Sequence, residues 1–281
     1  MRRLIVNADD FGLHQSVNQG IRNAHLQGIV TSASLMAGGA AFAEAVGIAQ
    51  ECSRLGVGVH LALVGGRPVL PAGEVPSLVD GEGFFFTSYP LFLTRYLSGR
   101  ISLTEIEREL AAQIAKVRLA GINPSHLDSH QHLHVMPGIS QLVLSLARRF
   151  SIRAIRIPAE SALFFSGMQP TFGRVLGRTG LTLLAGLFRQ QAAAAGVVTA
   201  DHFFGMLAGG NLTEPKLIAI LNQLPAGVSE IMTHPAAADD ALANDFDWGY
   251  HWEQEGRALS SAAIRALTEK KQIQLISFRE L

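Results

Sequence analysis

Short runs rich in aliphatic residues alternate along the whole chain with segments of helical periodicity, and this alternation constrains the fold more than any other feature. Residues 2–9 are typical of a buried strand, and residues 14–28 place Val17, Ile21 and Ala24 on one helical face before Gly28. Repeated strand–helix units imply a parallel sheet, either open or closed into a barrel. The expected strands lie within residues 2–9, 30–36, 56–63, 125–135, 152–158, 200–206, 228–234 and 273–277.

A single α/β domain spanning residues 1–281 is expected, because no linker or internal repeat interrupts the chain. The clearest helix covers residues 102–121, where Ser102 with Glu105, or Thr104 with Glu107, can form a capping box. Further helices are expected at about 41–54, 138–149 and 260–270. Two stretches, 65–100 and 159–199, are too long for ordinary connections, so we expect them to be excursions at one end of the sheet.

Composition excludes several classes of protein. Hydrophobic residues make up 48% of the chain and charged residues 16%, which argues against disorder. The net charge is zero, so nothing suggests a nucleic-acid partner. Cys52 is the single cysteine, which rules out an intrachain disulfide framework and fits a reducing, cytoplasmic compartment.

Neither a signal peptide nor a membrane span is expected. The apolar run after Arg2 and Arg3 is only Leu4-Ile5-Val6, too short for a signal sequence. The nearest approach to a membrane span, residues 180–198, is broken by "RQQ" beginning at Arg189.

Polar residues recur at the carboxyl ends of the expected strands, where parallel α/β folds gather residues into one crevice. The recurrence at five or six strands is more informative than any single position. The residues are Asp9 and Asp10, His60, the histidine-rich run 126–134, Arg156, Asp201 (which opens or adjoins its strand) and His234.

Adjacent carboxylates stand in "NADDFG", where Asp9 and Asp10 repel each other and are costly to bury. One interpretation is a turn, since Asn and Asp before Gly are common turn formers. The other is that one carboxylate binds a cation and the other handles a proton. The two side chains face opposite ways on an extended strand, but both can reach one site where the strand ends.

The segment "SHLDSHQHLHV" holds His126, Asp128, His130, His132 and His134, all at even positions. On a strand they would share one face, and a divalent metal would satisfy them there. Alternate residues of a strand lie about 6.6 Å apart, so the whole series cannot hold one ion. We therefore expect one ligand from this segment, with Asp128 and another histidine in supporting hydrogen bonds. The alternative is an exposed histidine-rich loop.

His60 and His234 each stand near the end of an expected strand. Taken alone, each is as well explained by a hydrogen-bonded structural histidine as by a metal ligand or a general acid.

With these residues in view, the chain resembles the YdjC/ChbG-like carbohydrate deacetylases. The resemblance rests on four motifs in family order that span nearly the whole chain: "IVNADDFG", "GVHLAL", "PSHLDSHQHLHVMP" and "MTHPA". It implies a distorted (β/α) barrel of the NodB type that uses one divalent metal ion to remove acetyl from N-acetyl sugars.

The resemblance also implies roles for individual residues. His60, His130 and Asp10 would be metal ligands, Asp9 the catalytic base and His234 the general acid. The polysaccharide deacetylases take two ligands from one His-x-x-x-His helix turn, whereas the resemblance draws one histidine here from each of two distant strands. This difference leaves the third ligand and the division of roles between the two aspartates open. His132 is the alternative ligand. Residues that would contact substrate or brace the site are Asp128, His132, His134, Arg156 and Asp201.

Stretches such as "TSASLMAGGAAF" and "GRPVLP" look similar to the hopanoid-biosynthesis-associated (HpnK-like) branch. That likeness implies an N-acetylglucosaminyl hopanoid substrate, with soluble chitooligosaccharides as the alternative. Segments 83–97 and 161–188 are rich in Leu and aromatic residues, and the second adds Arg174, Arg178 and Arg189. They could give peripheral contact with the inner membrane face. Ordinary packing or a homodimer interface would explain them equally.

Other classes remain open at this point. A metal-dependent amidohydrolase or phosphoesterase would usually carry a bridging carboxylate or a His-x-His on the first strand, where this chain has Asp-Asp. A sugar- or lipid-binding protein on the same fold would need no metal. A His/His/Asp set favours zinc over magnesium.

Overall fold

The computed structural model describes residues 1–161 and 172–281. Its sheet is parallel throughout, with strand order β5-β4-β3-β2-β1-β7-β6, and β8 pairs with the first half of β1. The strands are β1 (Arg2–Phe11), β2 (Ser32–Leu35), β3 (Gly56–Leu61), β4 (His126–Ser129), β5 (Ala154–Ile155), β6 (His202–Phe204), β7 (Gly227–Thr233) and β8 (Ile273–Leu275).

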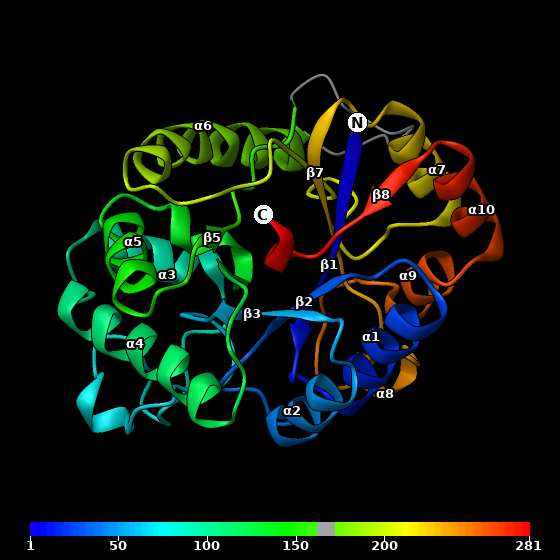
Figure 1. Cartoon of the computed structure of the whole chain (residues 1–281). Helices are drawn as coiled ribbons and strands as arrows, with labels where there is room; N and C mark the ends of the chain where they lie inside the picture. The colour runs from blue at the N-terminus through cyan, green and yellow to red at the C-terminus, as the bar shows by residue number, and fades with distance from the viewer. Residues whose placement is uncertain (162–171) are drawn as a thin grey trace.

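The sheet curves into a barrel that closes incompletely. Its edge strands are β5 and β6, and isolated bridges from Ala154 to Val198 and from Glu160 to Phe203 span the gap between them. The expected distorted (β/α) barrel is thus confirmed, and the short edge strands explain the distortion. The helices surround the strands in Figure 1. They are α1 (Gln15–Gln27), α2 (Phe42–Glu51), α3 (Tyr89–Leu97), α4 (Leu103–Leu119), α5 (Ile139–Arg149), α6 (Phe172–Ala194), α7 (Glu214–Gln223), α8 (Asp240–Ala243), α9 (Trp252–Leu259) and α10 (Ala262–Lys270).

The amino end of the barrel is plugged by the C-terminal turn η3 (Phe278–Glu280), which lies in the middle of the ring of strands in Figure 1. The Phe278 ring stacks on His126, with 3.8 Å between centroids, and the Phe278 amide donates to Ser32. Gly58 on β3 makes room for this layer, because a Cβ there would stand 2.4 Å from the His126 ring. With the centre of its amino end filled by this turn, the barrel interior is accessible from its carboxyl end.

Both long excursions contain helices. The stretch 65–100 forms η1 (Ala72–Glu74) and α3, and 159–199 contains α6. Ser102 caps α4 by accepting from the Glu105 amide, while the Glu105 carboxylate accepts from Ser77 and so ties the first excursion to α4. Residues 162–171 and the side chains of Arg174 and Arg178 lie outside the described residues. Within the described residues, no helix is both long and apolar enough to cross a membrane.

Candidate active site

The end of β1 delivers two neighbouring carboxylates to the barrel interior. Asp10 has φ of 63°, in the left-handed region, and the pairing of β1 with β2 shifts register between Ala8 and Phe11. This irregularity breaks the alternation of a regular strand. Asp9 and Asp10 are therefore both buried, each with 2% of its surface exposed, and each lies in a group of possible ligands that includes His60.

Two imidazole nitrogens converge on Asp10. Nδ1 of His130 lies 3.1 Å from Asp10 Oδ1, and Nε2 of His60 lies 3.4 Å from the same oxygen. One donor atom from each of Asp10, His60 and His130 lies within 4.8 Å of the other two, and all three residues are buried. Two imidazoles and one carboxylate, drawn from three separate segments, form a donor set that suits a divalent cation.

The second ring nitrogen of His60 is bound by Asp128, which accepts a hydrogen bond from His60 Nδ1 at 2.9 Å. Asp128 also accepts from the Ser34 hydroxyl and pairs with Arg156. Burial by itself would raise the pKa of Asp128, but Arg156 and His60 hold it far below its ordinary value. Because Asp128 stays ionised, the Nδ1 proton of His60 is fixed, and Nε2 is left to face Asp10 as a candidate ligand nitrogen.

Without a cation, the protonated form of His60 is favoured. Burial alone would lower the pKa of the imidazole, but the carboxylates of Asp128 and Asp10 outweigh burial and raise it to about 10. The negative charge around His60 therefore favours binding of a cation, either a proton or a metal ion.

A second trio with suitable spacing consists of Asp9, His60 and Asp128. Its carboxylates are already engaged by Arg156, which donates to both oxygens of Asp9 at 2.7 Å and lies 2.8 Å from Asp128. A metal ion there would lie beside the guanidinium, and the two positive charges would repel. The trio that contains Asp10 fits a cation better.

Arg156 is fully buried and orients Asp9 through a bidentate ion pair. Its Nε donates to Glu230 at 2.7 Å, so a further buried carboxylate on β7 fixes the guanidinium from behind. Burial raises the pKa of Glu230 to about 7, although Arg156 opposes the rise. Sequence reasoning missed Glu230; the available signal was a charged residue inside the otherwise uncharged strand "VSEIMT".

The histidine-rich segment is not one strand, which corrects the expectation for residues 125–135. β4 ends at Ser129, and the 3₁₀ turn η2 (His130–Val135) follows with φ of 55° at Gln131 and 57° at His132. The even-numbered residues consequently point in different directions, and only His130 from this segment joins the trio around Asp10.

The remaining histidines of the segment have separate places. His126 lies in the layer above Phe278, and burial lowers its pKa to about 3. Both nitrogens of His134 are in use, one facing the Ser129 hydroxyl and the other the Arg156 carbonyl, so His134 braces the turn. His132 lines the cavity, its ring edge-on to Phe203, but belongs to neither trio found among the described residues.

His234 follows β7 and faces the same cavity. Its backbone amide donates to Glu255 at 2.6 Å, and its Nδ1 is buried with no hydrogen-bond partner among the described residues. A buried ring nitrogen without a partner, at the wall of a cavity, is available to a bound ligand. Glu255, on α9, is fully buried and was not foreseen from the sequence.

The cavity bounded by these groups, called here the active-site cavity, has a volume of about 390 Å³. Trp248 and Tyr250 close it, with Trp248 5.4 Å from His130 and Tyr250 5.1 Å from His234 between ring centroids. Sequence reasoning missed both. The signal was the alternation of aromatic residues in "FDWGYHW", whose rings at Phe246, Trp248, Tyr250 and Trp252 pack against one another.

Asp201 does not join the site. It precedes β6, and its carboxylate accepts a hydrogen bond from the Val228 amide near the start of β7. Strand starts lie at the amino end of a parallel barrel, opposite the candidate ligands. The expectation failed because "ADHFF" was assigned to a strand without fixing which end Asp201 occupies.

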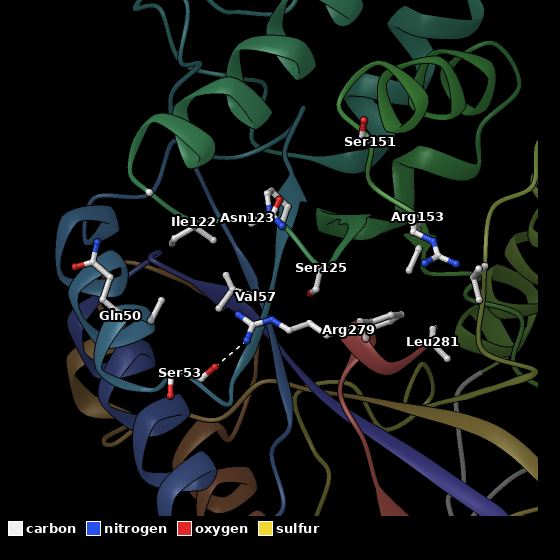
Figure 2. A pocket seen from close by; sticks show the side chains of 16 residues that line it. Gln50, Ser53, Val57, Ile122, Asn123, Ser125, Ser151, Arg153, Arg279 and Leu281 are labelled. Carbon is white, nitrogen blue, oxygen red and sulfur yellow. Dashed lines mark hydrogen bonds between the residues drawn. The ribbon is translucent and has the colours of Figure 1, made fainter.

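A separate cavity of about 570 Å³ also opens at the amino end, between β3, β4, β5 and the C-terminal turn. In Figure 2, the Arg279 side chain reaches across this cavity and donates a hydrogen bond to the Ser53 carbonyl. The Arg153 side chain does not point toward Ser53. None of the candidate site residues lines this cavity.

Comparison with known proteins agrees with the geometry. The family model described as YdjC-like protein matches residues 3–270. The chain belongs to the YdjC-like family. YdjC-like relatives include proteins named carbohydrate deacetylase from Brevibacillus brevis, 35% identical over 99% of both chains, and from Mus musculus, 31% identical over 99% of this chain and 94% of the relative.

A crystal structure from Enterococcus faecalis V583, of a protein proposed to cleave cellobiose phosphate, shares this fold. Its TM-score is 0.79 at 28% identity, covering 99% of this chain and 98% of the other. The shared fold therefore extends over nearly the whole chain.

Proposed function

We propose that this chain is a metal-dependent carbohydrate N-deacetylase, an amide hydrolase that releases acetate from an N-acetylated amino sugar. The observation that carries the proposal is the convergence of His60 Nε2 and His130 Nδ1 on Asp10, in the cavity that Asp9 and His234 also line. The names of the YdjC-like relatives support the same activity.

Asp10, His60 and His130 would hold one divalent cation, which when bound would polarise the acetyl carbonyl and lower the pKa of a water molecule. Asp9 would accept the proton of the attacking water, with its carboxylate held in place by Arg156. His234, when protonated, would donate to the leaving amine nitrogen, because an amine anion is far too basic to depart. The donor set favours zinc over magnesium.

The sugar would bind against Trp248 and Tyr250. Aromatic faces carry partial negative charge and attract the C–H groups of a pyranose ring. His132 lines the same cavity and is a candidate for contact with the sugar.

As the substrate we propose an N-acetylglucosaminyl hopanoid, a lipid-linked sugar, with soluble chitooligosaccharides as the alternative. Leu91 and Leu97 on α3 and Leu183 and Leu187 on α6 are exposed, and a groove lined by both helices lies between them. Exposed leucines on adjoining helices fit peripheral contact with the inner face of a membrane, although a homodimer would cover the same face.

Acetate release tests the proposal. The purified chain is incubated with N-acetylglucosaminyl hopanoid or with chitobiose, with and without a chelator, and acetate is measured. Release that the chelator abolishes supports a metal-dependent deacetylase, and the preferred substrate decides between lipid and soluble sugar. Binding of these sugars without any acetate release would favour a non-catalytic sugar- or lipid-binding protein.

A further inference from the structure

A second hollow of about 450 Å³ adjoins the active-site cavity and is called here the side hollow. His130, Gln131 and Trp248 line both. A ligand whose reacting group lies at His130 can therefore extend past Trp248 into the side hollow without leaving the protein surface.

Apolar groups form the floor and walls of the side hollow. Met36, Ala62 and Val64 are buried beneath it, and the rings of Phe84 and Phe246 stand at its sides. Gly38 and Gly39 complete one wall, where no side chain fits, because a Cβ would come within 2.4 Å of the Arg67 carbonyl or 2.1 Å of the Gly12 carbonyl.

Polar side chains stand at the rim. The Arg67 guanidinium lies 3.8 Å from the centre of the Phe84 ring. The guanidinium therefore covers the face of this ring and not the floor of the side hollow. Thr87, Gln131, Asp245 and Asp247 are exposed. The floor thus offers hydroxyl groups no side-chain partner, and a sugar ring buried there would lose hydrogen bonds to water without replacing them.

An apolar wall links the hollow to the candidate ligands. Phe246 lies 4.9 Å from Trp248, and Trp248 lies 5.4 Å from His130, between ring centroids. A group in the side hollow could therefore be joined by a short covalent link to a sugar whose acetamido group lies at His130.

We propose that the side hollow binds the apolar group joined to the acetylated sugar and so selects glycosides with an apolar aglycone. This inference rests on the proposed deacetylase function, and it assigns the aglycone to the side hollow rather than to the leucine-lined groove between α3 and α6.

The test compares the methyl and octyl β-glycosides of N-acetylglucosamine, which differ only in apolar length. Each buried methylene group adds roughly fourfold to affinity, so kcat/KM should be at least about tenfold higher for the octyl glycoside. Ala40→Phe fills the hollow from an exposed position on its wall and should bring the octyl-to-methyl ratio near unity. Ala263→Phe, exposed on α10, is the matched control and should keep the wild-type ratio.

Two additions keep the inference falsifiable. Thr87→Phe fills the hollow from a second exposed position if Ala40→Phe fails to fold. A change in tryptophan fluorescence when the octyl glycoside is added reports binding beside Trp248 and its neighbour Trp252 even where no acetate is released, which separates failure of this inference from failure of the proposed function. Equal kcat/KM for the two glycosides would overturn the assignment. So would a preference that survives filling of the hollow but is lost in Leu97→Arg, which makes the groove polar.

Discussion

Asp128 accepts a hydrogen bond from Nδ1 of His60 at 2.9 Å, and this contact decides which nitrogen of His60 can bind a cation. A carboxylate behind a ligand histidine orients the ring and makes it a stronger ligand. The relationship joins β3 to β4, whose residues His60 and Asp128 are register partners.

Asp128→Asn should therefore weaken divalent-metal binding by roughly 10- to 100-fold while leaving the three ligands in place. The measurement is competition with a chromophoric chelator. Asp201→Asn is the matched control, since Asp201 lies at the other end of the barrel, and it should bind metal like the wild type. Equal affinity in the two variants would contradict the role given to Asp128.

Replacing each histidine of the cavity separately tests the ligand set. His60→Ala and His130→Ala should lose both bound metal and acetate release, because each removes one of the three proposed ligands. His132→Ala should keep its metal, as measured by elemental analysis after dialysis. A His130→Ala protein that retains metal while His132→Ala loses it would show that the ligand from this segment is His132.

His234→Ala should separate metal binding from turnover. His234 belongs to neither trio of candidate ligands, so the metal content should match that of the wild type. Loss of the proton donor should lower kcat by about 10²- to 10⁴-fold. Wild-type turnover in this variant would exclude the general-acid role.

Acid should destabilise the metal-free protein through its buried histidines. Burial lowers the pKa of His126 to about 3 and that of His134 to about 4. Below about pH 6.5 the unfolded chain takes up protons at these positions while the folded chain does not, so stability falls as pH falls.

His126→Phe removes one such group and should flatten the decline by up to about 1.4 kcal/mol per pH unit between about pH 6 and 4. Denaturant unfolding with chelator present measures this slope. If the free energy of unfolding fell with pH at the same slope in the wild type and the variant, His126 would have to take up its proton in the folded state.

Much of the fold could be predicted from the sequence because strand–helix alternation leaves few arrangements for a parallel sheet. All eight expected strand segments contain a strand, and the polar residues expected at the carboxyl ends do meet, apart from Asp201 and His126, which lie toward the amino end. Sequence placed Asp201 beside a strand but could not say at which end, because β6 is only His202–Phe204.

The parts that could not be predicted depend on backbone geometry and long-range contacts. Nothing in "ADDF" specifies the positive φ of Asp10, and nothing in "SHQHLH" specifies that of Gln131 and His132. Glu230 meets Arg156 across 74 positions in the chain, and Trp248 reaches His130 only once the barrel is formed. Such pairings join residues that are far apart in the sequence, so the folded structure shows them and local sequence patterns do not.

The most direct test of the central claim is acetate release from N-acetylglucosaminyl hopanoid by chelated protein to which zinc is then added back, with bound metal counted in parallel. Our account predicts no release after chelation and recovery that saturates at one metal ion per chain, with His60→Ala showing neither binding nor recovery. Full acetate release by the metal-free chain would contradict it.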